Sequence, residues 1–311
     1  LKNKTSFLTP TQIRSGWMKH IKIEEENFLW VSNQKAFDLM KEGVLPPETS
    51  DPNLNEHFEM IDAQLTTEIF GFLAPSRSDI ALKMAELPIL TTARYDAKWI
   101  SQFYVSMYSL ATTIDTKKDI KYNILTIADK SRYLLPETSY SSKMYDYVKG
   151  QYLEGKSWEE ARDNVYERYQ VESKDGYNIT SKKLYCNGCF AAGINFAASL
   201  ISLFWGEGNL KRTIKIGTLT GWDSDNPTST WGGLIGFIIG KKGVEKEFNR
   251  KFSEKYYIHR TRQNFDYDVD DFDNMANNAI KIITNMVKNE INGRFDQENQ
   301  LWYIPQVDQI N

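Results

Sequence analysis

Two aspartates separated by a single residue stand out in the stretch GTLTGWDSDNPTSTWGG, residues 217–233. Asp223 and Asp225 flank Ser224, and Asn226 adds an amide oxygen. Neighbouring carboxylates repel each other unless a positive charge lies between them. Carboxylate, amide and hydroxyl oxygens are the ligands that Mg²⁺ and Mn²⁺ prefer. One interpretation is therefore a hard divalent cation bound by Asp223, Asp225 and Asn226.

A helix cap explains the same residues equally well. The apolar, glycine-rich segment that follows is typical of a helix, and Asp225 or Asn226 would cap its positive end. A calcium loop of the EF-hand type fits less well. Counted from Asp223, the sixth position is Thr228, where that loop has glycine, and the twelfth is Leu234, where it has glutamate. The residues alone leave the cap and the cation open.

Three other side chains are weaker candidates for the same site. Trp222 lies beside the acidic pair and would stack on or wall a substrate, although a core tryptophan is an equally good explanation. Gln64 and Glu68 share a helix face in DAQLTTE, where ordinary packing or solvent exposure is the commoner explanation.

Two charged segments near the C-terminus have simple structural explanations. HRTR, residues 259–262, would meet phosphate groups, but a basic surface turn is the more common case. DYDVDDFDN, residues 266–274, is rich in acids and precedes an apolar periodic segment. Acids at that position favour the positive end of a helix dipole, so we expect a solvated helix start.

The elements that position these residues are predicted to be helical. Thr9 and Pro10 form a helix start, and apolar residues recur at helical spacing from there to position 21. Periodic segments without strand-like alternation predict an all-α fold in one domain over residues 1–311. The other expected helices cover residues 24–42, 59–75, 78–86, 93–113, 117–129, 140–150, 157–170, 187–205, 209–219, 227–241 and 270–292.

Composition limits the class of protein. The 311 residues are 41% hydrophobic and carry a net charge of −3, with the basic residues scattered, which argues against nucleic acid as a partner. The longest apolar stretches are shorter than the roughly 20 residues that span a bilayer, so we expect no membrane partner. The two cysteines, Cys186 and Cys189, suit a reducing compartment, and we expect a cytoplasmic protein whose CxxC pair enters a buried helix.

The acidic loop and its flanks resemble the ADP-ribosylglycohydrolase family. GTLTGWDSDNPTSTWGGLIGFIIG is similar to the family's C-terminal metal motif, G-x-D-[TS]-D-x before a helix rich in small residues. AGINFAASLISLFWGEGNLKRTIKIGTLTGWDSDN resembles the preceding helix pair, and IDAQLTTEIFGFLAPSRSDIALKMAELP resembles the central helices. WMKH, FLWVSNQKAFDLMKEGVLPP and FYVSMYSLA are similar to segments of one subgroup, so the resemblance covers most of residues 10–240.

The resemblance implies a compact all-α hydrolase that uses two Mg²⁺ or Mn²⁺ ions to cleave a glycosidic bond of ADP-ribose. Its substrate would be an ADP-ribosylated protein or a small molecule that contains ADP-ribose. Asp223 and Asp225 take the places of catalytic metal ligands, and Asn226 stands where the family has Thr or Ser. We expect Trp222 and Ser224 to contact the substrate, with a carboxylate near the metal as general base.

One family motif has no counterpart in the sequence. The family's second acidic motif, of the type Asp-Asp-Thr, lies in its N-terminal part, whereas the only Asp-Asp pair here is Asp270-Asp271. Half of the two-metal site is therefore missing, and we expect the chain either to lack its N-terminal segment or to hydrolyse poorly. The alternatives are a non-catalytic protein that keeps the fold and binds an ADP-ribose-like ligand, and a helical scaffold whose acidic loop is only a cap.

Overall fold

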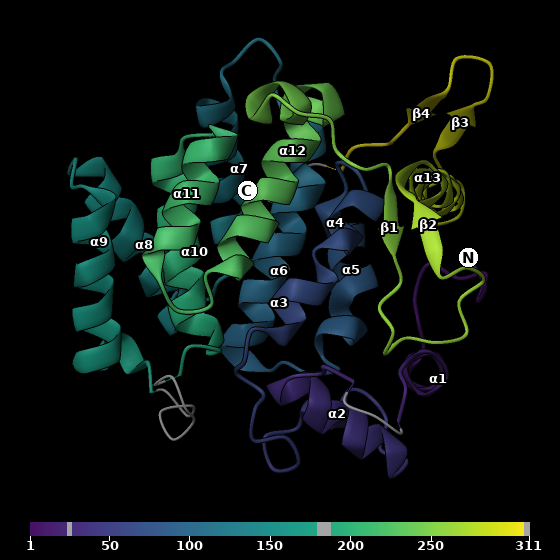
Figure 1. The fold of residues 1–311 in the computed structure, drawn as a ribbon, viewed down its shortest axis with the longest axis horizontal. Coiled ribbons are helices and arrows are strands. Elements are labelled where there is room, and N and C mark those ends of the chain that lie inside the picture. The colour runs from purple at the N-terminus through teal and green to yellow at the C-terminus, as the bar shows by residue number, and fades with distance from the viewer. Residues whose placement is uncertain (24–26, 179–187, 308–311) are drawn as a thin grey trace.

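Helices dominate the computed structural model, which describes residues 1–23, 27–178 and 188–307 (Figure 1). The N-terminal half contains α1 (Pro10–His20), α2 (Val31–Lys41), α3 (Asp62–Thr67), α4 (Ile69–Leu73), α5 (Ser78–Ile89), α6 (Tyr95–Leu110) and α7 (Ile120–Arg132). The C-terminal half contains α8 (Tyr140–Leu153), α9 (Trp158–Val165), α10 (Ala192–Gly206), α11 (Leu210–Thr220), α12 (Asp225–Phe248) and α13 (Phe272–Asn289).

Side-chain caps fix several helix starts at the predicted places. Thr9 accepts from the backbone N–H of Gln12 at 3.3 Å, and the Gln12 side chain accepts from the N–H of Thr9 at 2.9 Å, which is a capping box ahead of Pro10. Ser157 and Glu160 form a second capping box at α9. The predominantly helical fold predicted from the sequence is confirmed.

The centre of the core is α10, in which every residue is buried. It packs against α6, α8, α11 and α12, so its apolar surface is covered all round. Trp231 of α12 is fully buried against it and donates from Nε1 to the Ser199 carbonyl at 2.8 Å. The Tyr104 hydroxyl lies 2.5 Å from the Ser199 hydroxyl, and the Tyr104 and Trp231 rings are 5.1 Å apart. These contacts fix the first turns of α12 on the core.

Several predicted helices have other bounds than the observed ones. Among the described residues of the predicted helix 24–42, α2 begins only at Val31, and residues 27–30 are not helical; Phe28 has a φ angle of +54°, outside the right-handed helical region. The segment 59–75 divides into α3 and α4. In the C-terminal half, α12 turns sharply at Gly240, where φ is +70°. This turn is close to residue 241, where the helix was predicted to end.

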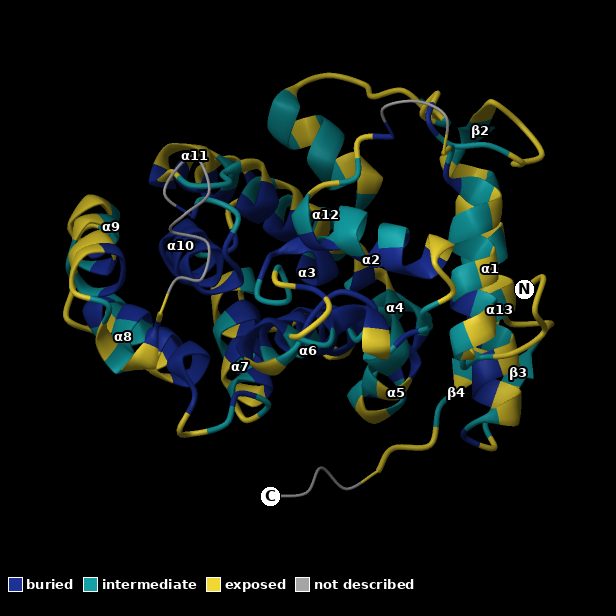
Figure 2. Ribbon diagram, turned by 90° about the horizontal axis from the view of Figure 1, so that it is seen from below, coloured by how far each residue is buried: buried dark blue, intermediate teal, exposed yellow. Residues whose placement is uncertain are grey.

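Two small hairpins, which the sequence did not predict, lie at one edge of the molecule beside α13 (Figure 1). The strands β1 (Lys255–Tyr257) and β2 (Val269–Asp271) pair antiparallel, as do β3 (Arg294–Asp296) and β4 (Leu301–Tyr303). The opposite edge is formed by α8 and α9, with the core helices between (Figures 1 and 2). Among the described residues, no helix combines the length and apolarity that crossing a bilayer requires.

Candidate active site

The acidic loop joins α11 to α12 through a tight change of direction. Gly221 has a φ of +104° and Trp222 a φ of +53°, so both lie in the left-handed half of backbone space. Asn195 of α10, which is fully buried, accepts a 3.1 Å hydrogen bond at Oδ1 from the N–H of Asp223. Its Nδ2 donates to the Ala191 carbonyl at 2.9 Å. The core therefore holds the loop at Asp223.

The side-chain cap expected from Asp225 or Asn226 is not formed by the described residues. The helix α12 begins at Asp225 with Ser224 in the N-cap position, and no side chain makes the capping hydrogen bond. Asp225 lies in the first turn, where its charge favours the helix dipole, but it is exposed. Asp223 and Asp225 are thus not needed as caps.

A third carboxylate, Asp62, lines the same cleft, and it was not predicted. Asp62 is the first residue of α3 and is only 5% exposed. The Ser32 hydroxyl donates to its Oδ2 at 2.6 Å, and the backbone N–H groups of Ser32 and Asn33 add hydrogen bonds at the start of α2. Burial nevertheless outweighs these bonds and raises the pKa of Asp62 to about 6.

Asp225 and Asp62 influence the charge of Asp223. Burial, a hydrogen bond with Asp225 and the charges of Asp225 and Asp62 raise the pKa of Asp223 to about 7. A raised pKa is the expected result when a half-buried carboxyl group is held beside like charges. A bound cation would reverse this shift, because it favours the charged form of both groups.

The cleft that contains these carboxylates has a volume of about 320 Å³. Asp62, Asp223 and Asp225 line it together with Ile61, and the aromatic residues Phe28, Trp30 and Phe190 line it as well. Its lining residues come from the starts of α2 and α12, from α3 and from the loops beside them. Carboxylates beside apolar walls are typical of small-molecule sites.

The other predicted site residues lie outside this lining. Asn226 is buried, its Nδ2 has no hydrogen-bond partner in the described part of the chain, and its Oδ1 lies 3.5 Å from the Thr230 hydroxyl, so it faces the core behind the loop. Trp222 is partly buried against the hydrophobic core. Ser224 contributes its carbonyl, which accepts from the Thr228 hydroxyl at 3.2 Å. Metal binding by Asn226 and substrate contacts by Trp222 and Ser224 stay predictions.

A buried polar network lies behind the loop. The Thr230 hydroxyl donates to Oε2 of Glu68 at 3.0 Å, and the Tyr108 hydroxyl donates to the Thr230 carbonyl at 2.5 Å. Burial raises the pKa of Glu68 to about 7 despite its hydrogen bonds with Thr230 and Tyr108. Gln64 is buried, and neither of its amide atoms has a hydrogen-bond partner among the described residues. Neither Glu68 nor Gln64 lines the cleft.

The fit of the cleft to a divalent cation rests on two carboxylates. Within residues 1–23, 27–178 and 188–307, no group of three or more His, Cys, Asp and Glu side chains is arranged to hold a metal ion. Asp223 and Asp225 remain as an adjacent pair. Mg²⁺ is commonly bound through one or two carboxylates and keeps several waters or substrate oxygens, so the pair fits one such ion.

The charged segments of the C-terminal region take the structures expected of them. Asp271 caps α13 by accepting from the N–H of Asn274 at 2.7 Å, as predicted for a helix start. HRTR forms a turn in which Arg262 donates from Nη1 to the Asn27 carbonyl at 2.9 Å.

Cys189 is disulfide-bonded, so the expectation of a reduced CxxC pair is wrong at this residue. Cys186 lies outside the described residues.

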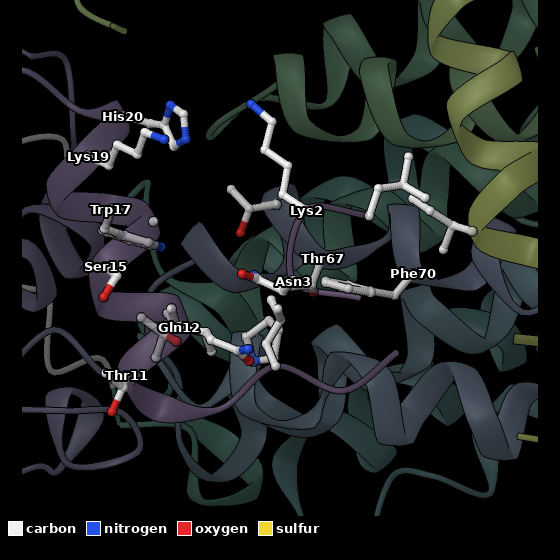
Figure 3. A pocket seen from close by; sticks show the side chains of 18 of the residues that line it. Lys2, Asn3, Thr11, Gln12, Ser15, Trp17, Lys19, His20, Thr67 and Phe70 are labelled. Carbon is white, nitrogen blue, oxygen red and sulfur yellow. The ribbon is translucent and has the colours of Figure 1, made fainter. Parts of the chain in front are cut away.

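A larger cavity of about 950 Å³ shares a wall with the cleft, since Thr66 lines both. Figure 3 shows Trp17, Lys19 and His20 of α1 on one side of it and Phe70 on the other. Its lining combines Lys2 and Lys19 with Asp266 and with amide side chains, whereas the charged residues that line the cleft are all acidic.

Comparison of the chain with protein-family models, with curated proteins and with solved structures finds no match.

Asp62 was missed because its partners come from α2 and from the acidic loop, which no local pattern connects to it. The available signal was an acidic side chain near the start of the predicted helix 59–75.

Proposed function

We propose that the chain is a metal-dependent hydrolase that cleaves the glycosidic bond of ADP-ribose in a modified protein or small molecule. The observation that carries the proposal is the convergence of Asp62, Asp223 and Asp225 on one cleft from segments far apart in the sequence. The resemblance of the acidic loop and its flanks to ADP-ribosylglycohydrolases supports the same reaction class.

Each of the three aspartates has a separate role in the proposed reaction. Asp223 and Asp225 would hold one Mg²⁺ or Mn²⁺ ion, which supplies orientation of the ribose hydroxyls and polarisation of water. Asp62 is the proposed general base, because its pKa of about 6 lies near neutral pH and Ser32 fixes its orientation. It takes a proton from the water that forms a bond to the anomeric carbon. The glycosidic bond breaks through an oxocarbenium-like state, and the proton passes to the leaving group.

The test is an assay of the full chain with a mono-ADP-ribosylated peptide, in which released ADP-ribose is measured with Mg²⁺, with Mn²⁺ and with chelator. We expect release only with a cation and a loss of at least about 100-fold in Asp223→Asn and in Asp62→Asn. Asp273→Asn, an exposed aspartate in α13, is the matched control and should keep full activity.

Three results would contradict the proposal in different ways. Calorimetry that finds cation-dependent binding of ADP-ribose without any release would support a binding protein that keeps the fold. Absence of both cation binding and ligand binding would leave a helical scaffold. Equal release with and without chelator would remove the role of the cation.

A further inference from the structure

A second cavity, of about 950 Å³, lies beside the acidic cleft. Its lining residues come mainly from the segment before α1, from α1, from α3 and α4 and from α13. Its volume is at the upper end of the range in which proteins bind small molecules. Asp62, Asp223 and Asp225 are not among the described residues that line it. The cavity is therefore a candidate ligand site of its own.

The helix α3 forms the wall between the cleft and the cavity. Thr66 lines both of them, whereas Leu65 lines the cleft and Thr67 lines the cavity. The Thr66 hydroxyl donates to the Asp62 carbonyl at 2.9 Å, and the Thr67 hydroxyl donates to the Ala63 carbonyl at 2.7 Å. Because both threonine hydroxyls are bonded within the helix, recognition of a ligand in the cavity depends on other side chains.

Several polar side chains of the cavity offer hydrogen-bond donors. The Gln12 amide oxygen accepts from the N–H of Thr9 at 2.9 Å, which leaves its NH₂ group for a ligand. Trp17 and Lys19 carry donors and no acceptor, and Figure 3 shows the indole nitrogen of Trp17 turned toward the interior. No atom of the described residues accepts a hydrogen bond from Trp17 Nε1 or Lys19 Nζ. The cavity therefore favours a ligand that is rich in acceptors.

Positive charge gathers at one end of the cavity. Figure 3 shows the side chains of Lys2, Lys19 and His20 at this end. Asp266 is the acidic side chain among the described lining residues, and its Oδ1 lies 3.8 Å from Lys2 Nζ. Both partners of this pair are largely exposed, so their attraction is weak. Lys19 has no acidic partner within the described residues, so an anion is favoured here over a cation.

Two aromatic rings form the centre of the apolar lining. The Trp17 ring lies 6.5 Å from the ring of Phe37, which is 1% exposed, so Trp17 is held against the core. Phe70 lies across the cavity from Trp17 and is packed against the hydrophobic core (Figure 3). Ile13 and Ile282 add aliphatic surface. A ring or a short chain of a ligand would be covered by these side chains, which favours its transfer from water.

We propose that this cavity is a second ligand site, which binds an organic acid. The carboxylate lies at the end that carries Lys2 and Lys19, and the apolar body lies between Trp17 and Phe70. The inference goes beyond the proposed function, because it uses no residue that holds the metal or the reacting water. It therefore stands or fails independently of the hydrolase.

Calorimetry of the full chain with naphthylacetate, naphthylacetamide and acetate separates the two parts of the ligand. Naphthylacetamide has the same ring without the charge, and it should bind at least about 5-fold more weakly than naphthylacetate. Acetate keeps the charge without the ring, and it should bind at least about 10-fold more weakly, because it buries no apolar surface.

Variants of two lining residues assign these effects to the cavity. Lys19→Gln should weaken naphthylacetate about 5-fold and leave naphthylacetamide unchanged, because it removes charge alone. Trp17→Ala should weaken both ligands about 10-fold, because it removes the aromatic wall. Trp17→Phe keeps an aromatic face and should bind both ligands more tightly than Trp17→Ala does.

Two control variants lie in and beside α7, away from the cavity. Lys130→Gln removes the charge of an exposed lysine, and Tyr133→Ala removes a ring that is 68% exposed. Both should bind the three ligands like the unmodified chain. Thermal unfolding of each variant shows whether it is folded at the assay temperature. Lys19 is exposed, so Lys19→Gln tests the site even if Trp17→Ala does not fold.

The inference is overturned if the unmodified chain binds naphthylacetate no better than naphthylacetamide or acetate. It is also overturned if Lys19→Gln binds naphthylacetate like the unmodified chain. Asp223→Asn should leave the affinity for naphthylacetate unchanged. Tighter binding in that variant would place the anion in the acidic cleft, where removal of a negative charge favours it, and would exclude the cavity as its site.

Discussion

The hydroxyl of Ser32 donates a 2.6 Å hydrogen bond to Oδ2 of Asp62, and this bond joins the first turn of α2 to the first turn of α3. Ser32 is fully buried and Asp62 is nearly so. A buried carboxylate is costly unless hydrogen bonds replace its water shell. The start of α2 therefore acts as the polar support of one wall of the cleft, and it also positions the Trp30 ring beside it.

Replacement of Ser32 by alanine should destabilise the protein. The variant leaves Oδ2 of Asp62 without its side-chain donor, which costs about 1 to 3 kcal/mol in the free energy of unfolding. The cost should be larger above pH 6, because the hydrogen bond favours the charged carboxylate. Urea denaturation at pH 5 and at pH 8 measures it. Ser15→Ala, at an exposed position of α1, is the control, and an equal loss in both variants would refute the prediction.

Glu68 should make the stability of the fold depend on pH. Its pKa is about 7 in the folded protein and near 4.5 when exposed, so the folded state binds more protons between these values. The free energy of unfolding then falls as pH rises from about 4.5 to about 7, by up to about 3 kcal/mol for this group. Burial is the cause, because the charged form of Glu68 is poorly solvated between α4 and α12.

Glu68→Gln isolates that contribution. Glutamine keeps a carbonyl oxygen for the Thr230 hydroxyl but carries no charge, so the variant should be more stable than the unmodified chain at pH 8 and similar to it at pH 4. Chemical denaturation at the two pH values gives the difference. Glu42→Gln, an exposed glutamate at the end of α2, should show no such difference. A Glu68→Gln curve parallel to that of the unmodified chain would contradict the prediction.

The helices were predictable because their signals are local. The start of α1 is predicted by the capping pattern of Thr9, Pro10 and Gln12. Apolar periodicity predicts the helices α10 through α13. The hairpins were missed because strands of three residues are too short to show alternation. Asp223 and Asp225 could be found from spacing alone, whereas Asp62 could not, because the burial that raises its pKa depends on how α2 and α3 pack beside the loop.

Removal of the charge at Asp223 should stabilise the protein in the absence of divalent cations. Burial and the charges of Asp225 and Asp62 disfavour the ionised form, so Asp223→Asn relieves repulsion above pH 7. We expect a higher unfolding temperature for the variant in chelator at pH 8. Addition of Mn²⁺ should raise the unfolding temperature of the unmodified chain and leave that of the variant unchanged. A similar rise in both proteins would place the cation elsewhere.

The close crossing of α4 and α6 depends on Gly71, which lies in α4 about one helical turn after Glu68. A Cβ atom at Gly71 would overlap the Val105 carbonyl oxygen and lie 2.5 Å from Cβ of Tyr108. Gly71→Ala should therefore push the two helices apart and cost about 3 kcal/mol in the free energy of unfolding. Because Tyr108 interacts with Glu68 and donates to the Thr230 carbonyl, the same shift should loosen the support of α12.

Gly150→Ala provides the matched control for this substitution. Gly150 lies inside α8, where an added Cβ meets no atom within 4 Å, so alanine should stabilise the helix by about 0.5 to 1 kcal/mol. The two variants carry the same chemical change with opposite expected signs. Chemical denaturation of both distinguishes close packing at Gly71 from a general effect of alanine. A stabilising Gly71→Ala would contradict the prediction, because it would mean that α4 and α6 are far enough apart to accept a methyl group. The contact of Tyr108 with Thr230 would then be in doubt as well.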